Sequence, residues 1–225
     1  METPTLTTMV VLYTMGVRLN TELLVHELPL NDTIIKIEKQ GVLRRGESKK
    51  DRIRHRKAPP IVRRTTGFGH NSITLVLMSD GRGTQPNKEI TVKIFQNGVF
   101  HITGVRDETY DRDVTETLRA HIVATCPAAV LEGEWTPENR RVVLMNYKTR
   151  ISNITNLSRD TLHANVRRKG FKTNYEPAVY PAVKIYFPDT KWIAKVFRTG
   201  NIILTGMTSH DECALLMDKL REVLT

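Results

Sequence analysis

Hydrophobic and polar positions alternate along a short segment that occurs twice in the chain. In the first copy, VKIFQNGVFHITG, Val92 and Ile94 alternate with Lys93 and Phe95. A two-residue period predicts a strand with two different faces, and the Asn-Gly pair after it predicts a hairpin turn. The second copy, AKVFRTGNIILTG from Ala194, repeats the Lys, Phe, Gly and Thr-Gly positions 102 residues later. A fixed offset of this kind predicts a duplicated structural unit.

A helical period follows each hairpin. After the second copy, Ser209 stands as an N-cap with Glu212 three residues later, which is the pattern of a capping box. Apolar residues then recur at helical spacing on one face. These stripes are Val114, Leu118 and Ile122 after the first copy, and Leu216, Leu220, Val223 and Leu224 after the second. Each hairpin is therefore expected to pack one face against a long helix.

The segments before the hairpins match each other less well but follow the same order. Each half is expected to run strand, helix, four strands, helix, which is an α+β pattern. We expect the first repeat over residues 1–125, a linker over 126–139 and the second repeat over 140–225.

Composition adds a strong positive charge, which favours an anionic partner such as nucleic acid. The net charge is +10, and residues 44–64 hold ten Lys or Arg and two acids, so this insertion carries +8. Pro59-Pro60 and the lack of periodicity predict a loop or arm there. Phosphate contacts are expected from Arg52, Arg54, Arg56, Lys57, Arg63 and Arg64. A solvated or nuclear-targeting segment is the alternative.

Other sequence features exclude several classes. Apolar runs stay short of the roughly 18 residues of a spanning helix, and the acidic Glu2 near the N-terminus is unlike a signal peptide. Cys126 and Cys213 have no metal-like spacing, and we expect two reduced core thiols in an intracellular protein. His210, Asp211 and Glu212 are better explained by a helix start than by a metal or acid-base site. We expect no enzyme activity, no cofactor and no metal.

The stretch NYEPAVYPAVKIYFPDTKWIAKVFRTGNIILTGMTSHDE (174–212) resembles the second repeat of the TATA-box-binding protein (TBP) family. That repeat carries Tyr-Glu-Pro, then an aromatic residue before Pro, then a Phe-x-x-Gly hairpin that ends in Leu-Thr-Gly. Residues 72–106 resemble the first repeat, while 1–43 and 140–170 match weakly. The divergence and the basic insertion are more like the versions encoded by large nucleocytoplasmic DNA viruses.

The resemblance implies a saddle of two pseudo-symmetric repeats, with a curved ten-stranded antiparallel sheet and helices on its convex face. The concave face of such a sheet lies on a DNA minor groove, where aromatic side chains wedge into base steps and kink the duplex. The implied function is promoter recognition as a general transcription initiation factor that bends A·T-rich DNA, as a monomer, in the nucleus or in a viral factory. Residue by residue, the resemblance places wedges at Phe95, Phe197, Tyr180 and Ile73, with Phe68 as the alternative to Ile73. It places groove-floor contacts at Thr103, Thr205 and Ile203.

Three of the expected groove positions depart from the family pattern. Lys93 and Lys195 stand where the family has leucine, and His101 stands where it has valine. An apolar lining of the minor groove favours A·T pairs by excluding the guanine amino group. Lysines there are expected to weaken that preference and to add phosphate or base-acceptor contacts.

Partner surfaces and alternative functions complete the expectations. Glu176 and Pro177 match the segment of the family that docks transcription factor IIB, although the neighbouring Ala178 and Val179 depart from it. An RNA polymerase machinery is the implied larger partner. One alternative is a nucleic-acid-binding module of a processing enzyme complex. A second is a protein-interaction scaffold that has lost DNA binding, and under it Phe95 and Phe197 would be ordinary core residues.

Overall fold

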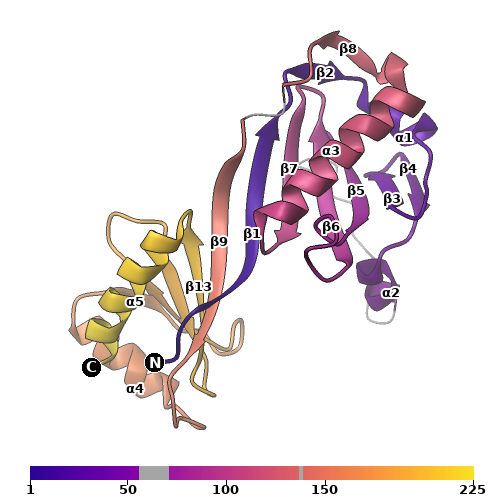
Figure 1. The fold of residues 1–225 in the computed structure, drawn as a ribbon. Coiled ribbons are helices and arrows are strands. Elements are labelled where there is room, and N and C mark those ends of the chain that lie inside the picture. The colour runs from indigo at the N-terminus through magenta and orange to yellow at the C-terminus, as the bar shows by residue number, and fades with distance from the viewer. Residues whose placement is uncertain (56–70, 137–138) are drawn as a thin grey trace. The chain divides into compact units, whose positions relative to one another are not determined.

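A computed structural model describes residues 1–55, 71–136 and 139–225 of the chain (Figure 1). They form two compact units. The N-terminal unit is Val10–Arg141, and the C-terminal unit combines Met1–Met9 with Val142–Thr225. The chain therefore changes unit twice, inside its first strand and at the start of its ninth.

The N-terminal unit is an antiparallel sheet with α1 and α3 packed on one face (Figure 1). Its strand order is β1-β7-β6-β5-β3-β4. The strands are β1 (Thr5–Thr14), β3 (Ile34–Lys39), β4 (Leu43–Gly46), β5 (Ser72–Ser79), β6 (Lys88–Phe95) and β7 (Val99–Val105). The helices are α1 (Thr21–Glu27), α2 (Lys49–His55) and α3 (Glu108–Thr125). A second, small sheet pairs β2 (Val17–Leu19) with β8 (Val130–Gly133).

The C-terminal unit repeats this design with fewer elements. Its strand order is β10-β11-β12-β13-β9, and residues 2–7 of the chain lie along β9. The Glu2 amide donates to the Arg150 carbonyl at 2.8 Å, and the Thr7 hydroxyl donates to the Asn146 carbonyl at 2.9 Å. The strands are β9 (Arg141–Arg150), β10 (Lys172–Asn174), β11 (Val183–Tyr186), β12 (Ile193–Val196) and β13 (Asn201–Met207). The helices are α4 (Arg159–Arg168) and α5 (His210–Leu224).

The alternation predicted for the two hairpins is confirmed. Val92, Ile94, Ala194 and Val196 are fully buried, on the sheet face that the long helices cover. The stripes predicted on those helices, among them Leu118 on α3 and Leu216 and Leu220 on α5, are also fully buried. The opposite residues of the hairpin strands lie on what we call the open face of each unit, the sheet face away from α3 or α5.

The repeated glycines have a backbone reason. Gly98 and Gly200 follow the hairpin turns at φ of 74° and 78°, and Gly104 and Gly206 follow the repeated threonines at φ of 93° and 99°. Only glycine adopts such angles without strain. At Gly206 the pairing of β13 with β9 shifts register, which marks a β-bulge, and a Cβ there would collide with the Lys191 carbonyl.

The predicted helix start at Ser209 is also confirmed, with one difference. The Ser209 hydroxyl accepts from the Glu212 amide at 3.2 Å. The Glu212 carboxylate reaches one residue further back than a standard capping box and accepts from the Thr208 amide at 2.7 Å.

The structure differs from the sequence expectations at the insertion and at the expected linker. The first part of the insertion forms β4 and α2, so among the described residues the main sheets of the two units hold eleven strands instead of ten, besides the small β2–β8 sheet. Residues of the expected linker form β8 and the 3-10 helix η1 (Pro127–Ala129), and Trp135 packs edge-on against buried Phe100 with ring centroids 6.4 Å apart. The described helices include none with the length and apolarity of a membrane span.

Candidate nucleic-acid interface

A row of side chains crosses the open face of the C-terminal unit from strand to strand. Direct cross-strand partners point to the same side of an antiparallel sheet. Lys195 on β12 is paired with Ile203 on β13 and with Lys184 on β11. Ile203 is in turn paired with Lys148 on β9. Three lysines therefore share this face, and among the described residues no carboxylate lies within ion-pair distance of them.

An aromatic pair lies at one end of that row. Tyr180 and Phe197 are half-buried, and their rings meet edge-on with centroids 6.0 Å apart. The ammonium groups of Lys184 and Lys195 lie 4.9 and 6.0 Å from the Tyr180 ring centroid. Phe197 is placed by the hairpin turn, whose Gly200 amide donates to the Phe197 carbonyl at 3.0 Å. The C-terminal unit thus presents two partly exposed rings beside a cluster of positive charge.

The open face of the N-terminal unit carries the corresponding row. His101, Lys93, Thr74, Glu38 and Arg44 are successive cross-strand partners from β7 to β4. The row is less positive than its counterpart because Glu38 lies within it. Burial and the positive charge of Lys93 lower the pKa of His101, so its imidazole is mostly neutral at pH 7.

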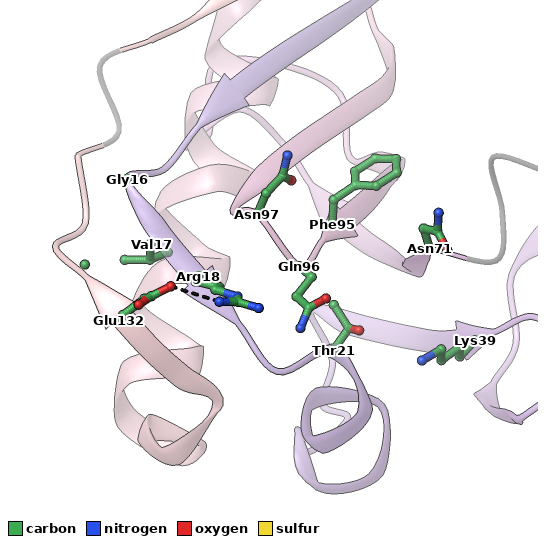
Figure 2. Close-up of a pocket in the computed structure, with 11 residues that line it drawn as sticks. Gly16, Val17, Arg18, Thr21, Lys39, Asn71, Phe95, Gln96, Asn97 and Glu132 are labelled. Atoms are coloured by element: carbon green, nitrogen blue, oxygen red, sulfur yellow. Dashed lines mark hydrogen bonds and ion pairs between the residues drawn. The ribbon is translucent and has the colours of Figure 1, made fainter.

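Phe95 ends β6 and borders open space. It lines a pocket of about 1000 Å³ together with Gln96 and Asn97 of the following turn (Figure 2). Across this pocket, Arg18 and Glu132 form an ion pair at 3.2 Å between β2 and β8 (Figure 2). The Phe95 side chain is half-buried, like Phe197. The pocket leaves room for a partner to approach the Phe95 ring.

Ile73 is a correction to the predicted site. It is fully buried and is the cross-strand partner of fully buried Ile94, so it lies under the helices and not on the open face. Lys184 faces Lys195, and Thr74 faces Lys93, so Thr74 is the counterpart of Lys184. Tyr180 precedes Lys184 by four residues. The same count back from Thr74 reaches residue 70, which lies outside the described residues, as does Phe68.

The other predicted groove residues lie on the open faces. Thr103 is paired with Thr91 on β6, and Thr205 is paired with Ile193 on β12. Both threonines are partly exposed, as are His101 and Ile203. The structure therefore brings Lys195, Ile203, Thr205, Tyr180 and Phe197 onto one face, and Lys93, His101, Thr103 and Phe95 onto another.

Helix α2 lies against part of the open face of the N-terminal unit. The register places Lys36 and Val76 on that face, yet their exposed fractions are only 5% and 4%. The Lys36 ammonium is 3.1 Å from the Asp51 carboxylate of α2. Asp51 also accepts from the Ser48 amide and hydroxyl at 2.9 and 2.7 Å, and Arg44 lies 3.1 Å away.

These contacts change the prediction for the basic insertion. Its first residues are a docked strand and helix rather than an arm, and Asp51 forms ion pairs with Lys36 and Arg44. Burial alone would raise the pKa of Asp51, but hydrogen bonds from Ser48 and Lys36 and the Lys36 charge outweigh burial and hold this pKa at about 2. Of the predicted phosphate contacts, Arg52 is exposed on α2 and Arg54 belongs to α2. The predicted contacts outside the described residues are Arg56, Lys57, Arg63 and Arg64.

The predicted partner segment is exposed at a turn before β11. The amides of Val179 and Tyr180 both donate to the Glu176 carbonyl at 2.9 Å, and Asn174 donates to the Glu176 carboxylate at 2.8 Å. Glu176 and Pro177 are exposed, and Val179 is 78% exposed.

Sequence reasoning missed Lys184 and Lys148. Both lie in strands whose alternation puts them on the open face, so the two-residue period could have identified them. Their proximity to Lys195 could not have been found, because it depends on the register between three strands.

The described residues contain no group of three or more His, Cys, Asp or Glu that could hold a metal ion. Cys126 and Cys213 are buried free thiols, and burial raises the pKa of both.

Two units of one design, each a sheet with a long helix packed on one face, define a class of duplicated α+β proteins. Residues 150–225 match the sequence model of the family described as transcription factor TFIID, or TATA-binding protein, TBP. No curated protein sequence matches the chain.

The solved structure of Methanococcus jannaschii TBP has a TM-score of 0.62 to this chain at 14% sequence identity, and the match covers 99% of this chain and 98% of that one. Residues 150–225 are thus similar in sequence to the TBP family, and the chain as a whole has the TBP fold.

Proposed function

We propose that this protein binds double-stranded DNA in the minor groove through its two open faces and bends it, as a promoter-recognition factor. The observation that carries the proposal is the Tyr180–Phe197 ring pair beside Lys184 and Lys195. Partly exposed rings on a basic sheet face have the shape and charge to enter an opened base step next to phosphates. The family match over residues 150–225 supports the same function.

Phe95 is proposed as the corresponding wedge of the N-terminal unit. Its exposure beside the large pocket supports this role. Thr103, Thr205 and Ile203 are proposed to touch base edges, and Lys93, Lys195 and Lys148 to contact phosphates or base acceptors. A·T-rich promoter elements are the proposed target, because the minor groove displays the extra amino group only at G·C pairs.

The exposed turn at Glu176 and Pro177 is proposed to dock a transcription factor IIB-like protein, which would bring in an RNA polymerase. The proposed compartment is the nucleus or a viral factory, wherever the promoter DNA is transcribed. A monomer suffices, since one chain supplies both wedge sites.

Energy transfer between dyes at the two ends of a short A·T-rich duplex tests the proposal. Wild-type protein is expected to bring the dyes closer, and to do so less on a G·C-rich duplex of equal length. Phe197→Ala is expected to remove a large part of the bend, because opening a base step costs a few kcal/mol that the inserted ring must offset. Lys219→Ala on α5 is the control. Unchanged energy transfer with Phe197→Ala would refute wedging at this site.

A further inference from the structure

A second pocket lies at the outer edge of the open face of the C-terminal unit. It has a volume of about 460 Å³ and lies beside β10 and β11. Its lining includes Lys172, Asn174, Tyr180, Lys184 and Tyr186. The volume is in the range of ordinary small-molecule sites. The pocket next to Tyr180 therefore has room for a ligand other than the duplex DNA of the proposed function.

Two tyrosines flank this pocket along the direction of β11. Tyr180 comes just before the strand and Tyr186 ends it, and both are half-buried. Lys184 lies between them on the same face, since residues two apart share a face of a strand. The order along the pocket is therefore ring, cation, ring.

The ammonium group of a lysine lies near each of the two tyrosine rings. The Lys172 ammonium is 5.5 Å from the Tyr186 ring centroid, and the Lys184 ammonium is 4.9 Å from the Tyr180 ring centroid. Lys184 also stands directly opposite Lys195. Like charges placed directly opposite destabilise a sheet unless an anion lies between them. Glu176, the carboxylate that lines the pocket, accepts from the Asn174 amide.

We infer that this pocket binds single-stranded nucleic acid, with bases stacked on Tyr180 and Tyr186 and phosphates on Lys172 and Lys184. Alternating rings and cations on a sheet face suit an unpaired strand, because every base has a stacking face and every nucleotide a charge. The inference goes beyond the proposed function, since it requires neither a duplex nor bending.

The lysines over the rings do not prevent stacking. An exposed ammonium–ring contact stabilises less than the stacking of a base on the same ring. A base therefore displaces the lysine, and the flexible lysine side chain moves onto the adjacent phosphate. The ligand replaces two ring contacts with stacking and also relieves the repulsion between Lys184 and Lys195.

Fluorescence anisotropy of a labelled twelve-residue oligothymidylate with the full chain tests the inference. Wild-type protein is expected to bind it. Tyr186→Ala is expected to weaken binding at least about fivefold, the loss of one stacked base, while Tyr186→Phe keeps the ring and the affinity. Lys172→Gln is expected to weaken binding and to reduce its salt dependence. Thermal melting followed by circular dichroism identifies any variant that fails to fold.

Duplex bending is measured on the same variants. It is expected to be unchanged in Tyr186→Ala and Lys172→Gln, because neither residue belongs to the wedge pair. The inference is overturned if the oligothymidylate does not bind, if folded Tyr186→Ala or Lys172→Gln binds it like wild type, or if an oligoglutamate peptide competes equally well. None of these results depends on whether the wild type bends duplex DNA, which tests the proposed function alone.

Discussion

At the scale of single residues, burial distinguishes Ile73 from Phe95, although both are apolar in the sequence. Phe95 is half-buried at the end of β6, while Ile73, on the neighbouring strand, is fully buried. Ile73 faces the helices because its direct partner, Ile94, does. A change at Ile73 therefore acts on the core, and a change at Phe95 acts on the surface.

Ile73→Phe is expected to destabilise the protein by about 1–3 kcal/mol, because extra volume in a close-packed core forces neighbouring side chains out of position. Urea denaturation followed by circular dichroism measures the loss. Phe95→Ala is the comparison, and it is expected to cost less stability. Unchanged stability in Ile73→Phe, together with stronger duplex bending, would put Ile73 on the DNA surface after all.

Lys93 and Lys195 occupy matching positions on the two open faces. Replacing both with leucine is expected to sharpen the preference for A·T over G·C duplexes, because an apolar side chain excludes the guanine amino group from the minor groove. Binding of paired duplexes at one salt concentration measures the ratio of affinities. Lys191→Leu together with Lys219→Leu is the matched charge control. A ratio that stays constant or falls would mean that the lysines themselves take part in reading the groove.

At the scale of elements, α2 is the feature that sequence patterns describe least well. It has seven residues, and a helix of that length is unstable in water by itself. Its order depends on the Asp51 carboxylate. That carboxylate accepts hydrogen bonds from the Ser48 amide and hydroxyl and forms ion pairs with Lys36 and Arg44 of the sheet. The element is therefore fixed by one buried carboxylate.

Asp51→Asn is expected to release α2, because the amide keeps the shape but loses the charge that Lys36 and Arg44 bind. Faster hydrogen exchange at the α2 amides measures this release. Asp113→Asn on α3 is the control. Release of α2 would also expose Val76 and the part of the open face around it. The variant is therefore expected to bind duplex DNA more tightly as well. Slow exchange at α2 in Asp51→Asn would show that the carboxylate does not hold the helix.

The same contact predicts a pH dependence. The pKa of Asp51 is about 2 in the folded protein and lies below its ordinary value of 3.8. A depressed carboxyl pKa stabilises the folded form above the unfolded value, and this contribution is lost as the pH falls through the folded value. The α2 amides are thus expected to stay protected down to about pH 4 and to lose protection between about pH 4 and 2. In Asp51→Asn this step is expected to be absent.

At the scale of the whole molecule, the chain crosses between its two units at β1 and near Arg140. Asp111 of α3 is fully buried, and it accepts from Arg140 at 2.7 Å and from the Tyr13 hydroxyl at 3.3 Å. Burial raises the pKa of Asp111, while the hydrogen bonds from Arg140 and Tyr13 oppose that rise. Arg140 and Tyr13 therefore fasten two distant parts of the chain to α3 within the N-terminal unit.

Arg140→Ala is expected to destabilise the N-terminal unit by about 3 kcal/mol, because it leaves a buried carboxylate without its cation. The double variant Arg140→Ala with Asp111→Ala is expected to be more stable than Arg140→Ala alone. Thermal and urea unfolding of the two variants measure the coupling. Equal stability of Arg140→Ala and wild type would show that Asp111 is satisfied without Arg140.

Local patterns in the sequence determined the strands and helices of each half. The two-residue period around Val92 and Ala194, the glycines at the turns and the Ser209 cap act within a few residues, so they can be predicted without tertiary contacts. The 102-residue repeat determined that the two halves share a design. Those features sufficed to predict that Phe95 shares a sheet face with Lys93, and that Phe197 shares one with Lys195.

Only the tertiary structure decided the placements that depend on register between distant strands. A one-residue change of register moves a side chain to the other face of a sheet. The family resemblance placed Ile73 on the DNA-binding face, but its pairing with buried Ile94 places it under the helices. Register also set Lys184 opposite Lys195, and it joined residues 2–7 to β9 in the C-terminal unit. The docking of α2 rests on an ion pair between Lys36 and Asp51 across 15 residues. Such contacts form between surfaces that exist only after the chain has folded, so no local pattern encodes them.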